Sequence, residues 1–261
     1  MSLCVQGDCL ELMKDLPDKS VSLFLCDLPY GCLNGGAGKE KKSRKEGVNQ
    51  EGGCKWDVKI DLVKFWEQVK RLCKTDNTPI IMFCNTKFGI DLINSNPTWF
   101  RYDLVWAKNG GTNFQLSGKQ PMKSHEMIYV FSKKGAFYNN IKVKVEGKKA
   151  YKRPKDYVRS KIDGCVKPIL ETSPDVQDNT RCVLSVINFS SRHNKLHPTC
   201  KTIELYKWLI ERYSNEGDMV LDPTAGSFNS GRACIELNRQ YIGMEMNKKF
   251  YDNNKIGSLE L

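Results

Sequence analysis

An acidic residue, a proline and an aromatic residue follow a short apolar run near the N-terminus, in the order Asp27, Leu28, Pro29 and Tyr30. If the run from Val21 to Cys26 is a strand, its end presents a carboxylate and a ring at one edge of a sheet. A planar aromatic amine can stack on the ring while it donates hydrogen bonds to the carboxylate. Such bonds make the nitrogen more nucleophilic and stabilise the charge that grows as it attacks a sulfonium methyl group. The plain alternative is a buried strand that ends in a proline turn.

A run of small residues near the C-terminus has the composition of a nucleoside site. A strand candidate from Met219 to Leu221 leads into Asp222, a turn and a helix candidate, and the next strand candidate ends in Glu245, 19 residues after Gly226. Glycine lets backbone approach a ligand, and a carboxylate in this place can accept both hydroxyls of a ribose. The run lacks the Gly-x-Gly-x-x-Gly dinucleotide fingerprint. An ordinary turn between a strand and a helix is the alternative.

The rest of the chain alternates short apolar runs with helical patterns, which predicts βαβ units around a largely parallel sheet. The other strand candidates are Pro79 to Cys84, Tyr102 to Trp106, Met127 to Phe131 and Tyr241 to Met244. The helix candidates are Leu62 to Cys73, Lys201 to Tyr213 and Ser230 to Asn238. Ligands of open α/β sheets bind beyond the carboxyl ends of the strands, where both candidate sites fall.

The composition favours a nucleic-acid partner. The 261 residues predict one sizeable α/β domain with a small accessory region, and 41 Lys and Arg against 30 Asp and Glu give a net charge of +11. No apolar run approaches the roughly 18 residues of a membrane span, and the N-terminus lacks a signal pattern, so we expect a cytoplasmic protein without a membrane partner. The 11 cysteines form no Cys-x-x-Cys pair. Neither a disulfide framework nor a metal site is therefore predicted.

Two segments carry nearly all of the excess positive charge. Residues 135–195 hold 13 Lys and Arg against 6 Asp and Glu, and residues 32–55 hold 6 against 3. The second segment is rich in glycine and has no apolar periodicity, which predicts a long mobile loop. A solvated loop without a partner is the alternative for this segment.

The four residues from Asp27 to Tyr30 resemble the Asp-Pro-Pro-Tyr box of DNA amino-methyltransferases, with Leu28 as in phage-type members. The amine-binding box precedes the cofactor box, an order similar to that of the circularly permuted beta class. Further motifs match this family in order: Gly7-Asp8 with Leu12, Pro17 and Ser20-Val21; Lys55-Trp56-Asp57; His125-Glu126 with Val130-Phe131; His197-Pro198-Thr199; Asp222-Pro223; and Glu245.

The resemblance implies an α/β, Rossmann-like, S-adenosylmethionine-dependent methyltransferase fold with circularly permuted motif order and a small inserted target-recognition region. Residues 1–134 and 196–261 would form the catalytic and cofactor-binding core, residues 135–195 the recognition region, and residues 32–55 a basic mobile loop within the core. The expected activity is site-specific methyl transfer from S-adenosyl-L-methionine to the N6 amine of adenine in double-stranded DNA. Adenine is favoured because Asp27, rather than serine, heads the box. A homodimer and a cognate restriction enzyme are left open.

The family pattern assigns roles to individual residues. The expected catalytic residues are Asp27, Leu28, Pro29 and Tyr30. Asp8 would lie near the adenine of the cofactor, Glu245 at its ribose, and the segment from His197 to Lys201 near its methionine end. The full set of expected cofactor-binding residues is Asp8, Asp27, His197, Thr199, Lys201, Asp222, Thr224, Gly226, Ser227, Phe228, Asn229 and Glu245. Asp8 has an alternative as the cap of a helix that starts near Cys9, and His197 has one as a turn residue.

The cofactor box departs from the family pattern. The run from Thr224 to Phe228 lacks the leading aromatic residue and the second glycine of the usual Phe-x-Gly-x-Gly, and Thr202 replaces the usual proline after His-Pro-Thr-x-Lys. Either Phe228 supplies the missing ring from another position, or the cofactor binds weakly.

Several rival functions follow from the same residues. A cytosine-N4 DNA methyltransferase attacks with the same kind of amine, and a catalytically decayed DNA-binding homologue would retain the basic regions. Methylation of RNA or of protein glutamine is less favoured by the ordered motifs. A cytosine-C5 enzyme is disfavoured because it needs a nucleophilic cysteine after proline, and the sequence has no Pro-Cys pair.

Overall fold

The structure is a computed structural model that describes residues 2–31, 58–144, 180–190 and 200–256. The chain divides into two compact units, Met1–Asn139 with Ser185–Leu261, and Asn140–Leu184. The described part of the second unit contains an antiparallel ribbon of β6 (Val143–Lys144) and β7 (Thr180–Arg181). The basic loop at 32–55 and most of the region expected to recognise the target lie outside the described residues, so both assignments stay predictions.

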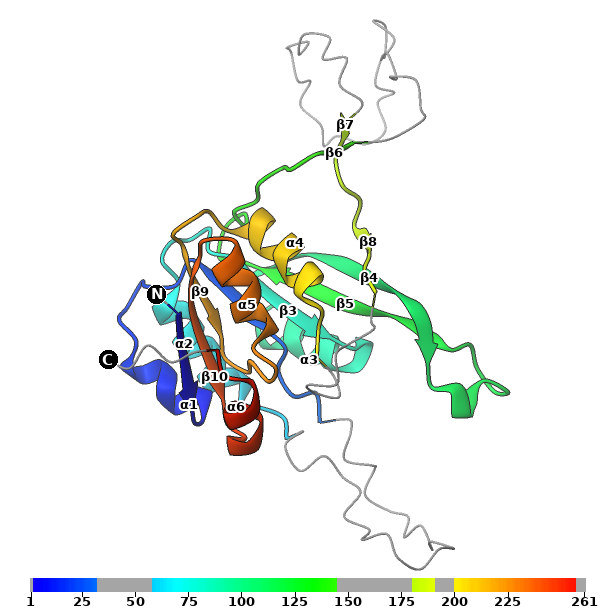
Figure 1. The fold of residues 1–261 in the computed structure, drawn as a ribbon, viewed down its shortest axis with the longest axis horizontal. Helices are drawn as coiled ribbons and strands as arrows, with labels where there is room; N and C mark the ends of the chain where they lie inside the picture. Colours follow the sequence, from blue (N-terminus) through cyan, green and yellow to red (C-terminus); the bar gives the residue numbers. More distant parts are fainter. Residues whose placement is uncertain (1, 32–57, 145–179, 191–199, 257–261) are drawn as a thin grey trace, which may run out of the picture. The chain divides into compact units, whose positions relative to one another are not determined.

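The first unit is built on a sheet that, within the described residues, has eight strands in the order β1-β10-β9-β2-β3-β5-β4-β8 (Figure 1). The strands from β1 to β3 in this order are all parallel, whereas β5 is antiparallel to both β3 and β4, and β8 is parallel to β4. The bounds are β1 Ser2–Gln6, β2 Leu23–Cys26, β3 Ile80–Cys84, β4 Phe100–Thr112, β5 Lys123–Phe131, β8 Val186–Asn188, β9 Met219–Asp222 and β10 Gln240–Glu245.

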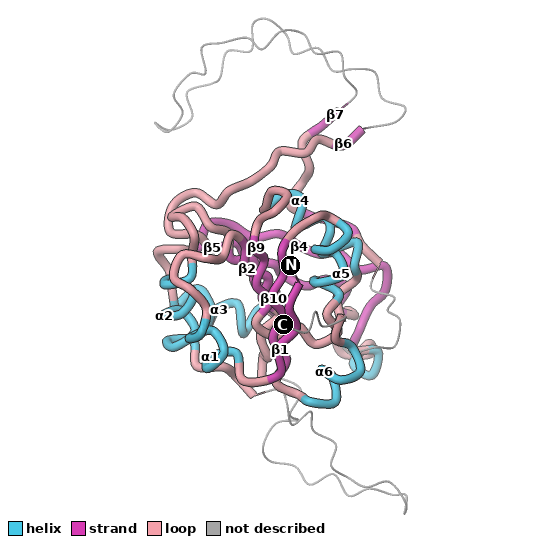
Figure 2. The backbone as a smooth tube through the Cα atoms, turned by 60° about the vertical axis from the view of Figure 1, so that its left-hand side comes forward, coloured by secondary structure: helices cyan, strands magenta, loops and turns pink. Residues whose placement is uncertain are grey.

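Helices cover both faces of this sheet, as Figure 2 shows. One face carries α1 (Cys9–Leu12), α2 (Leu62–Leu72) and α3 (Thr86–Ser95), and the other carries α4 (Ile203–Tyr213), α5 (Asn229–Glu236) and α6 (Lys248–Asn254). Short 3-10 helices occur at Met13–Asp15 and Phe114–Leu116. No helix in the described residues is long and apolar enough to cross a membrane.

The central strands are apolar on both sides because each face of the sheet has its own core. Leu23 and Leu25 of β2 belong to the core beneath α4 and α5, while Phe24 and Cys26 belong to the core beneath α1, α2 and α3. Residues of β3 alternate in the same way, and all five of them are buried. This double burial explains why the sequence shows continuous apolar runs at these strands.

Polar caps set the starts of several helices at positions that the sequence marks. Asp61 accepts hydrogen bonds from the backbone N–H groups of Val63 and Lys64 at the start of α2. Asn85, Thr202 and Asn247 cap α3, α4 and α6 in the same manner. Such caps satisfy N–H groups that have no partner within the helix.

By the general rule for open α/β sheets, the order of the strands places the ligand crevice between β9 and β2. From β9 the chain passes through α5 to β10, on one side in the sheet, and from β2 it passes through α2 to β3, on the other. The helices of the two crossovers lie on opposite faces. Ligands of open α/β sheets bind at such a reversal, beyond the carboxyl ends of the strands. These ends carry Asp222 and Asp27.

All six predicted strands and all three predicted helices exist, with shifted ends. The expectation of a largely parallel sheet is confirmed, because among the described strands of this sheet β5 alone runs antiparallel to its neighbours, and with β4 it forms a long hairpin. The strand β4 also extends to Thr112, well beyond the predicted Trp106. Residues 108–112 are polar or glycine, and past Trp106 the pairing with β5 continues at Ala107 and, after a register shift, at Thr112, which a hydrophobic pattern cannot reveal.

Candidate active site

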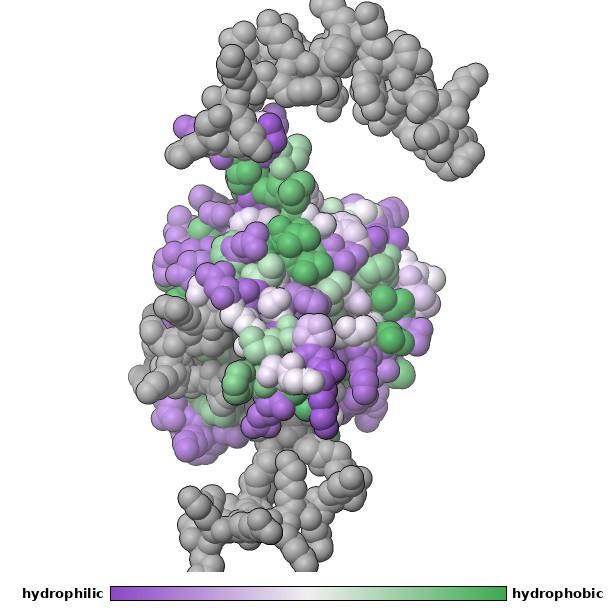
Figure 3. Space-filling view, turned by 90° about the vertical axis from the view of Figure 1, so that its right-hand side faces the viewer, coloured by the Kyte–Doolittle hydropathy of each residue, from purple (hydrophilic) through white to green (hydrophobic). Residues whose placement is uncertain are grey.

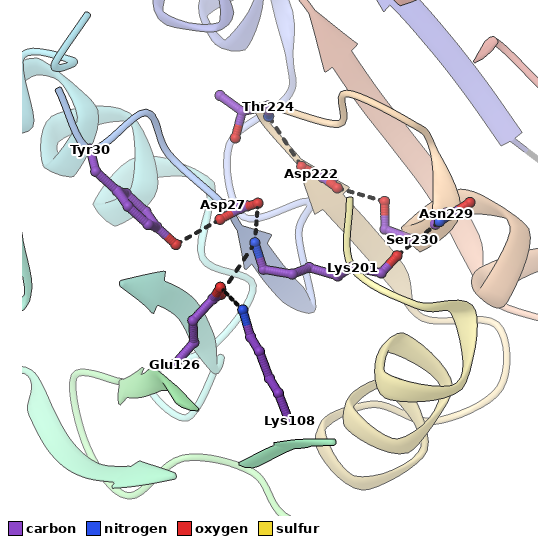
Figure 4. Close-up of polar contacts among 9 residues, drawn as sticks. All are labelled: Asp27, Tyr30, Lys108, Glu126, Lys201, Asp222, Thr224, Asn229 and Ser230. Carbon is purple, nitrogen blue, oxygen red and sulfur yellow. Dashed lines mark hydrogen bonds and ion pairs between the residues drawn. The ribbon is translucent and has the colours of Figure 1, made fainter. Parts of the chain in front are cut away.

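Asp27 lies directly after β2 and receives hydrogen bonds on both carboxylate oxygens (Figure 4). The hydroxyl of Tyr30 donates to Oδ1 at 2.9 Å, and Nζ of Lys201 donates to Oδ2 at 2.5 Å. The Asp27 side chain is 20% exposed, so it can still be reached from the crevice. Each oxygen has a second lone pair, which leaves acceptor capacity for an incoming amine.

The Tyr30 ring is fixed by stacking against Phe88 of α3, with ring centroids 5.2 Å apart and an interplanar angle of 28°. Burial and the neighbouring Asp27 raise the pKa of Tyr30 well above its usual value, so the hydroxyl stays protonated and acts as a donor. Leu28 is 1% exposed and packs in the core beneath α1, α2 and α3. Its contribution to a site is therefore limited to its backbone.

Four charged side chains alternate in sign next to this box. Nζ of Lys201 lies 3.6 Å from Oε2 of Glu126 in β5, and Oε1 of Glu126 forms an ion pair with Lys108 of β4. Burial by itself raises the pKa of Glu126, but Lys201 and Lys108 outweigh it and lower that pKa below its usual value. Burial likewise opposes the charge of Lys201, and Asp27 and Glu126 raise the pKa of Lys201 above its usual value. Glu126 and Lys201 are therefore both charged near neutral pH.

The turn after β9 is held by Glu245, which ends β10. Its Oε2 accepts the backbone N–H of Gly226 at 2.9 Å, and its Oε1 accepts that of Asn247 at 2.7 Å. Gly226 has a φ of +53°, a left-handed conformation that favours glycine. The structure thus brings together the two residues that the sequence predicts for a nucleoside site.

Asp222 is an internal residue of this site. It is 1% exposed, and its carboxylate accepts the backbone N–H of Thr224 at 3.1 Å and the hydroxyl of Ser230 at 2.5 Å. Burial raises the pKa of Asp222 to about 7. Its contacts shape the turn, so any effect on a cofactor is exerted through the backbone from Thr224 onward.

Replacement of Asp222 by asparagine should change how stability depends on pH. The pKa of Asp222 is higher in the folded chain than its ordinary value of 3.8. The protonated carboxyl therefore contributes fully to the free energy of unfolding below pH 3.8, and this contribution is lost as the pH rises through about 7. Asparagine has nearly the same shape and no titrating proton. We expect the free energy of unfolding to fall less between about pH 5 and pH 8 in Asp222→Asn than in the wild type. Urea titrations across this pH range measure the free energy of unfolding of both proteins. The same dependence on pH in the variant and the wild type would contradict the prediction.

Phe228 does not replace the missing aromatic residue of the cofactor box. Its φ of +55° turns the side chain inward, where it is fully buried and packs edge-on against Tyr251 at 6.1 Å between centroids. A stacked cofactor needs a free ring face, so that expectation is not supported.

The other predicted cofactor residues differ in what they offer. Ser227 is 4% exposed, and Asn229 uses its side chain to donate to the backbone carbonyl of Lys201 at 2.8 Å. The hydroxyl of Thr224 is buried without a hydrogen-bond partner among the described residues, which suits a polar ligand atom. Asp8 caps α1 by accepting the N–H of Leu10 at 2.8 Å, as its alternative predicted. His197 and Thr199 lie outside the described residues.

The positions of three charged side chains in the site are not evident from the sequence. Glu126 belongs to a matched motif, but the motif gives it no role, and Lys108 is part of no motif. Lys201 is predicted to lie near the cofactor's methionine end, which stays a prediction, and its ammonium group donates to Asp27, which the sequence did not indicate. In the described part of the chain, no group of three or more His, Cys, Asp or Glu side chains is arranged to hold a metal ion.

The fold and site together define a Rossmann-like methyltransferase: a nucleoside-type turn ends β9, and an amine-binding box ends the adjacent β2. A family model described as DNA methylase matches residues 21–255. The chain therefore belongs to this family of N6 and N4 DNA methylases and is an S-adenosylmethionine-dependent DNA methyltransferase. The family resemblance and the fold class expected from the sequence are confirmed at this level.

Relatives and solved structures agree over nearly the whole chain. DNA adenine methyltransferase YhdJ of Escherichia coli (strain K12) is 27% identical over 94% of this chain and 79% of its own length. Type II methyltransferase M.HpaI of Haemophilus parainfluenzae is 26% identical over 95% and 71%. The M1.HpyAVI–SAM complex has a TM-score of 0.57 at 19% identity, covering 97% of this chain and 98% of that one. The cytosine-N4-specific PvuII DNA methyltransferase has a TM-score of 0.62 at 14% identity, covering 99% and 87%.

Proposed function

We propose that this protein methylates the N6 amine of adenine in double-stranded DNA, and that it is a permuted, beta-class enzyme with a phage-type Asp-Leu-Pro-Tyr box. The observation that carries the proposal is the Asp27 carboxylate, held by Tyr30 and Lys201, at the end of the strand next to the Gly226 turn. The relative YhdJ bears the name of an adenine methyltransferase, which supports the same target.

The residues at the end of β2 suit an attack by an aromatic amine. S-adenosylmethionine, when bound, supplies a methyl group on a positively charged sulfur. Asp27 would accept a hydrogen bond from the amine and thereby direct the nitrogen lone pair away from the ring system. Asp27 would also stabilise the positive charge that develops on the amine as it takes up the methyl group from the sulfur. The surplus amine proton then leaves to water.

The Gly226 turn suits the nucleoside part of the cofactor. Glu245 has two lone pairs beyond those that bind Gly226 and Asn247, and the Thr224 hydroxyl lies buried and unpaired among the described residues. We assign Glu245 to the ribose of the cofactor. The adenine of the cofactor would lie near Asp8, as the resemblance implies. The segment from His197 to Lys201 remains the predicted neighbour of the methionine end.

DNA is assigned to the basic segments and to the hairpin. Residues 135–195 and 32–55 carry most of the excess positive charge, which would neutralise phosphates. The tip of the β4–β5 hairpin exposes Phe114, Leu116 and Met122, and Figure 3 shows hydrophobic residues interspersed with hydrophilic ones on that side of the molecule. A cytoplasmic location and a homodimeric state remain predictions that go with this proposal.

The identity of the methylated base tests the proposal. The purified chain, S-adenosylmethionine with a labelled methyl group, and double-stranded DNA should yield labelled N6-methyladenine after digestion to nucleosides. Labelled N4-methylcytosine would show that the adenine assignment is wrong and that the cytosine-N4 alternative is right. No labelled base, together with no binding of the cofactor in calorimetry with DNA present, would show the decayed homologue instead.

A further inference from the structure

We propose that Lys201 is a positioning residue for methyl transfer: its ammonium group holds the Asp27 carboxylate in place and ties it to the turn that follows β9. The inference rests on the proposed function, because methyl transfer is what gives Asp27 its role. Lys201 itself is 4% exposed and acts through Asp27 rather than on the substrate.

The contacts around the Lys201 ammonium group hold it in one position. Nζ of Lys201 lies 2.5 Å from Oδ2 of Asp27 and 3.6 Å from Oε2 of Glu126, and it lies over the ring of Phe83 at 5.0 Å from the centroid. A charge that is buried among two carboxylates and an aromatic face cannot move toward water without losing these contacts. The ion pair between Lys201 and Asp27 therefore has a fixed geometry, whereas the side chains of an ion pair on the surface can move apart into water.

The backbone of Lys201 is anchored to the cofactor side of the crevice. Its carbonyl oxygen accepts a hydrogen bond from Nδ2 of Asn229, the first residue of α5, at 2.8 Å (Figure 4). The helix α5 follows directly on the turn that contains Gly226. One residue thus connects the helix that follows this turn to Asp27, which lies directly after the neighbouring strand β2.

This connection bears on the rate rather than on affinity. Methyl transfer needs the amine and the methyl carbon at a separation of about 3 to 3.5 Å with aligned orbitals, and a displacement of about 1 Å can cost about 100-fold in rate. Loss of the Lys201 side chain would free Asp27 to rotate away from this line.

The primary test is Lys201→Met, which keeps an unbranched apolar chain and removes the ammonium group. We expect kcat to fall by about 10- to 100-fold, with the dissociation constants for S-adenosylmethionine and DNA within about threefold of the wild type. Lys133→Met removes the cation of an exposed ion pair with Asp76 and leaves both partners of Asp27 in place, so its loss in kcat should be at most about threefold.

A double-mutant cycle with Asp27→Asn separates positioning from general stability. If Lys201 acts through Asp27, then Lys201→Met should reduce kcat by less than about twofold in the Asp27→Asn background. The double variant also removes both members of the buried ion pair, which keeps the test available if Lys201→Met alone does not fold. A further loss of about tenfold or more in this background would overturn the proposal.

The outcomes distinguish the two proposals. A wild-type protein that methylates no base would overturn the proposed function. A wild-type protein that methylates DNA, together with a Lys201→Met variant of unchanged kcat, would overturn the positioning role alone.

Discussion

Replacement of Asp27 by alanine is expected to lower the rate of methyl transfer by about 100- to 1000-fold, as with the loss of other preorganised hydrogen-bonding groups. The carboxylate is the acceptor that orients the amine, and its two oxygens are fixed by Tyr30 and Lys201. Its effect belongs to the transition state, so affinity for DNA should barely change. Single-turnover transfer of labelled methyl groups measures the rate, and a gel-shift titration measures DNA binding.

Matched variants show whether this loss arises from the carboxylate. Asp27→Asn keeps the shape and one acceptor oxygen and should lose less than Asp27→Ala. Tyr30→Phe keeps the ring and removes only the hydrogen bond to Oδ1, worth about 0.5 to 1.5 kcal/mol, so it should lose at most about tenfold. Tyr30→Ala removes the ring on which the target base would stack, a contact worth about 1 to 3 kcal/mol of binding free energy. Methylation by Asp27→Ala at the wild-type rate would mean that the catalytic groups lie elsewhere in the chain.

Replacement of Glu245 by alanine is expected to weaken the binding of S-adenosylmethionine by about 10- to 150-fold, the worth of one charge-assisted hydrogen bond of about 1.5 to 3 kcal/mol. The same carboxylate also receives the N–H groups of Gly226 and Asn247. Its removal therefore loosens the turn as well as the contact with the ribose. Calorimetric titration with the cofactor measures the change.

Glu245→Gln is the matched control for this effect. Its side-chain oxygen can still accept one of the two backbone N–H groups, so we expect a smaller loss of affinity than in Glu245→Ala. A Glu245→Ala variant that binds the cofactor as tightly as the wild type would show that the ribose is held elsewhere.

Several features of the site were predictable because they depend on residues close together in the sequence. The apolar run before Asp27 and the proline after it mark the end of a strand, and strands of this kind end at the ligand edge of an α/β sheet. Gly226 and Glu245 belong to one strand, helix and strand unit, so their proximity follows from the regular geometry of that unit. The caps Asp61 and Asn85 are likewise local signals.

The tertiary structure decided what lies around Asp27. Lys201 and Glu126 are far from Asp27 in the sequence and reach it only because β9, β2, β3 and β5 assemble in one sheet. The antiparallel pairing of β5 with β3 and β4 sets which side chains face the crevice, and hydrophobic patterns do not encode it.

Phe228 shows the limit of motif comparison at a single residue. A motif gives a residue's place in the chain, but the direction of its side chain depends on the backbone angles of the turn and on the space beneath it. At Phe228 the backbone is left-handed and the ring lies fully buried in the core, edge-on to Tyr251. The sequence by itself thus determined which segments form the two halves of the site. Long-range packing decided which side chains from distant parts of the sequence join them.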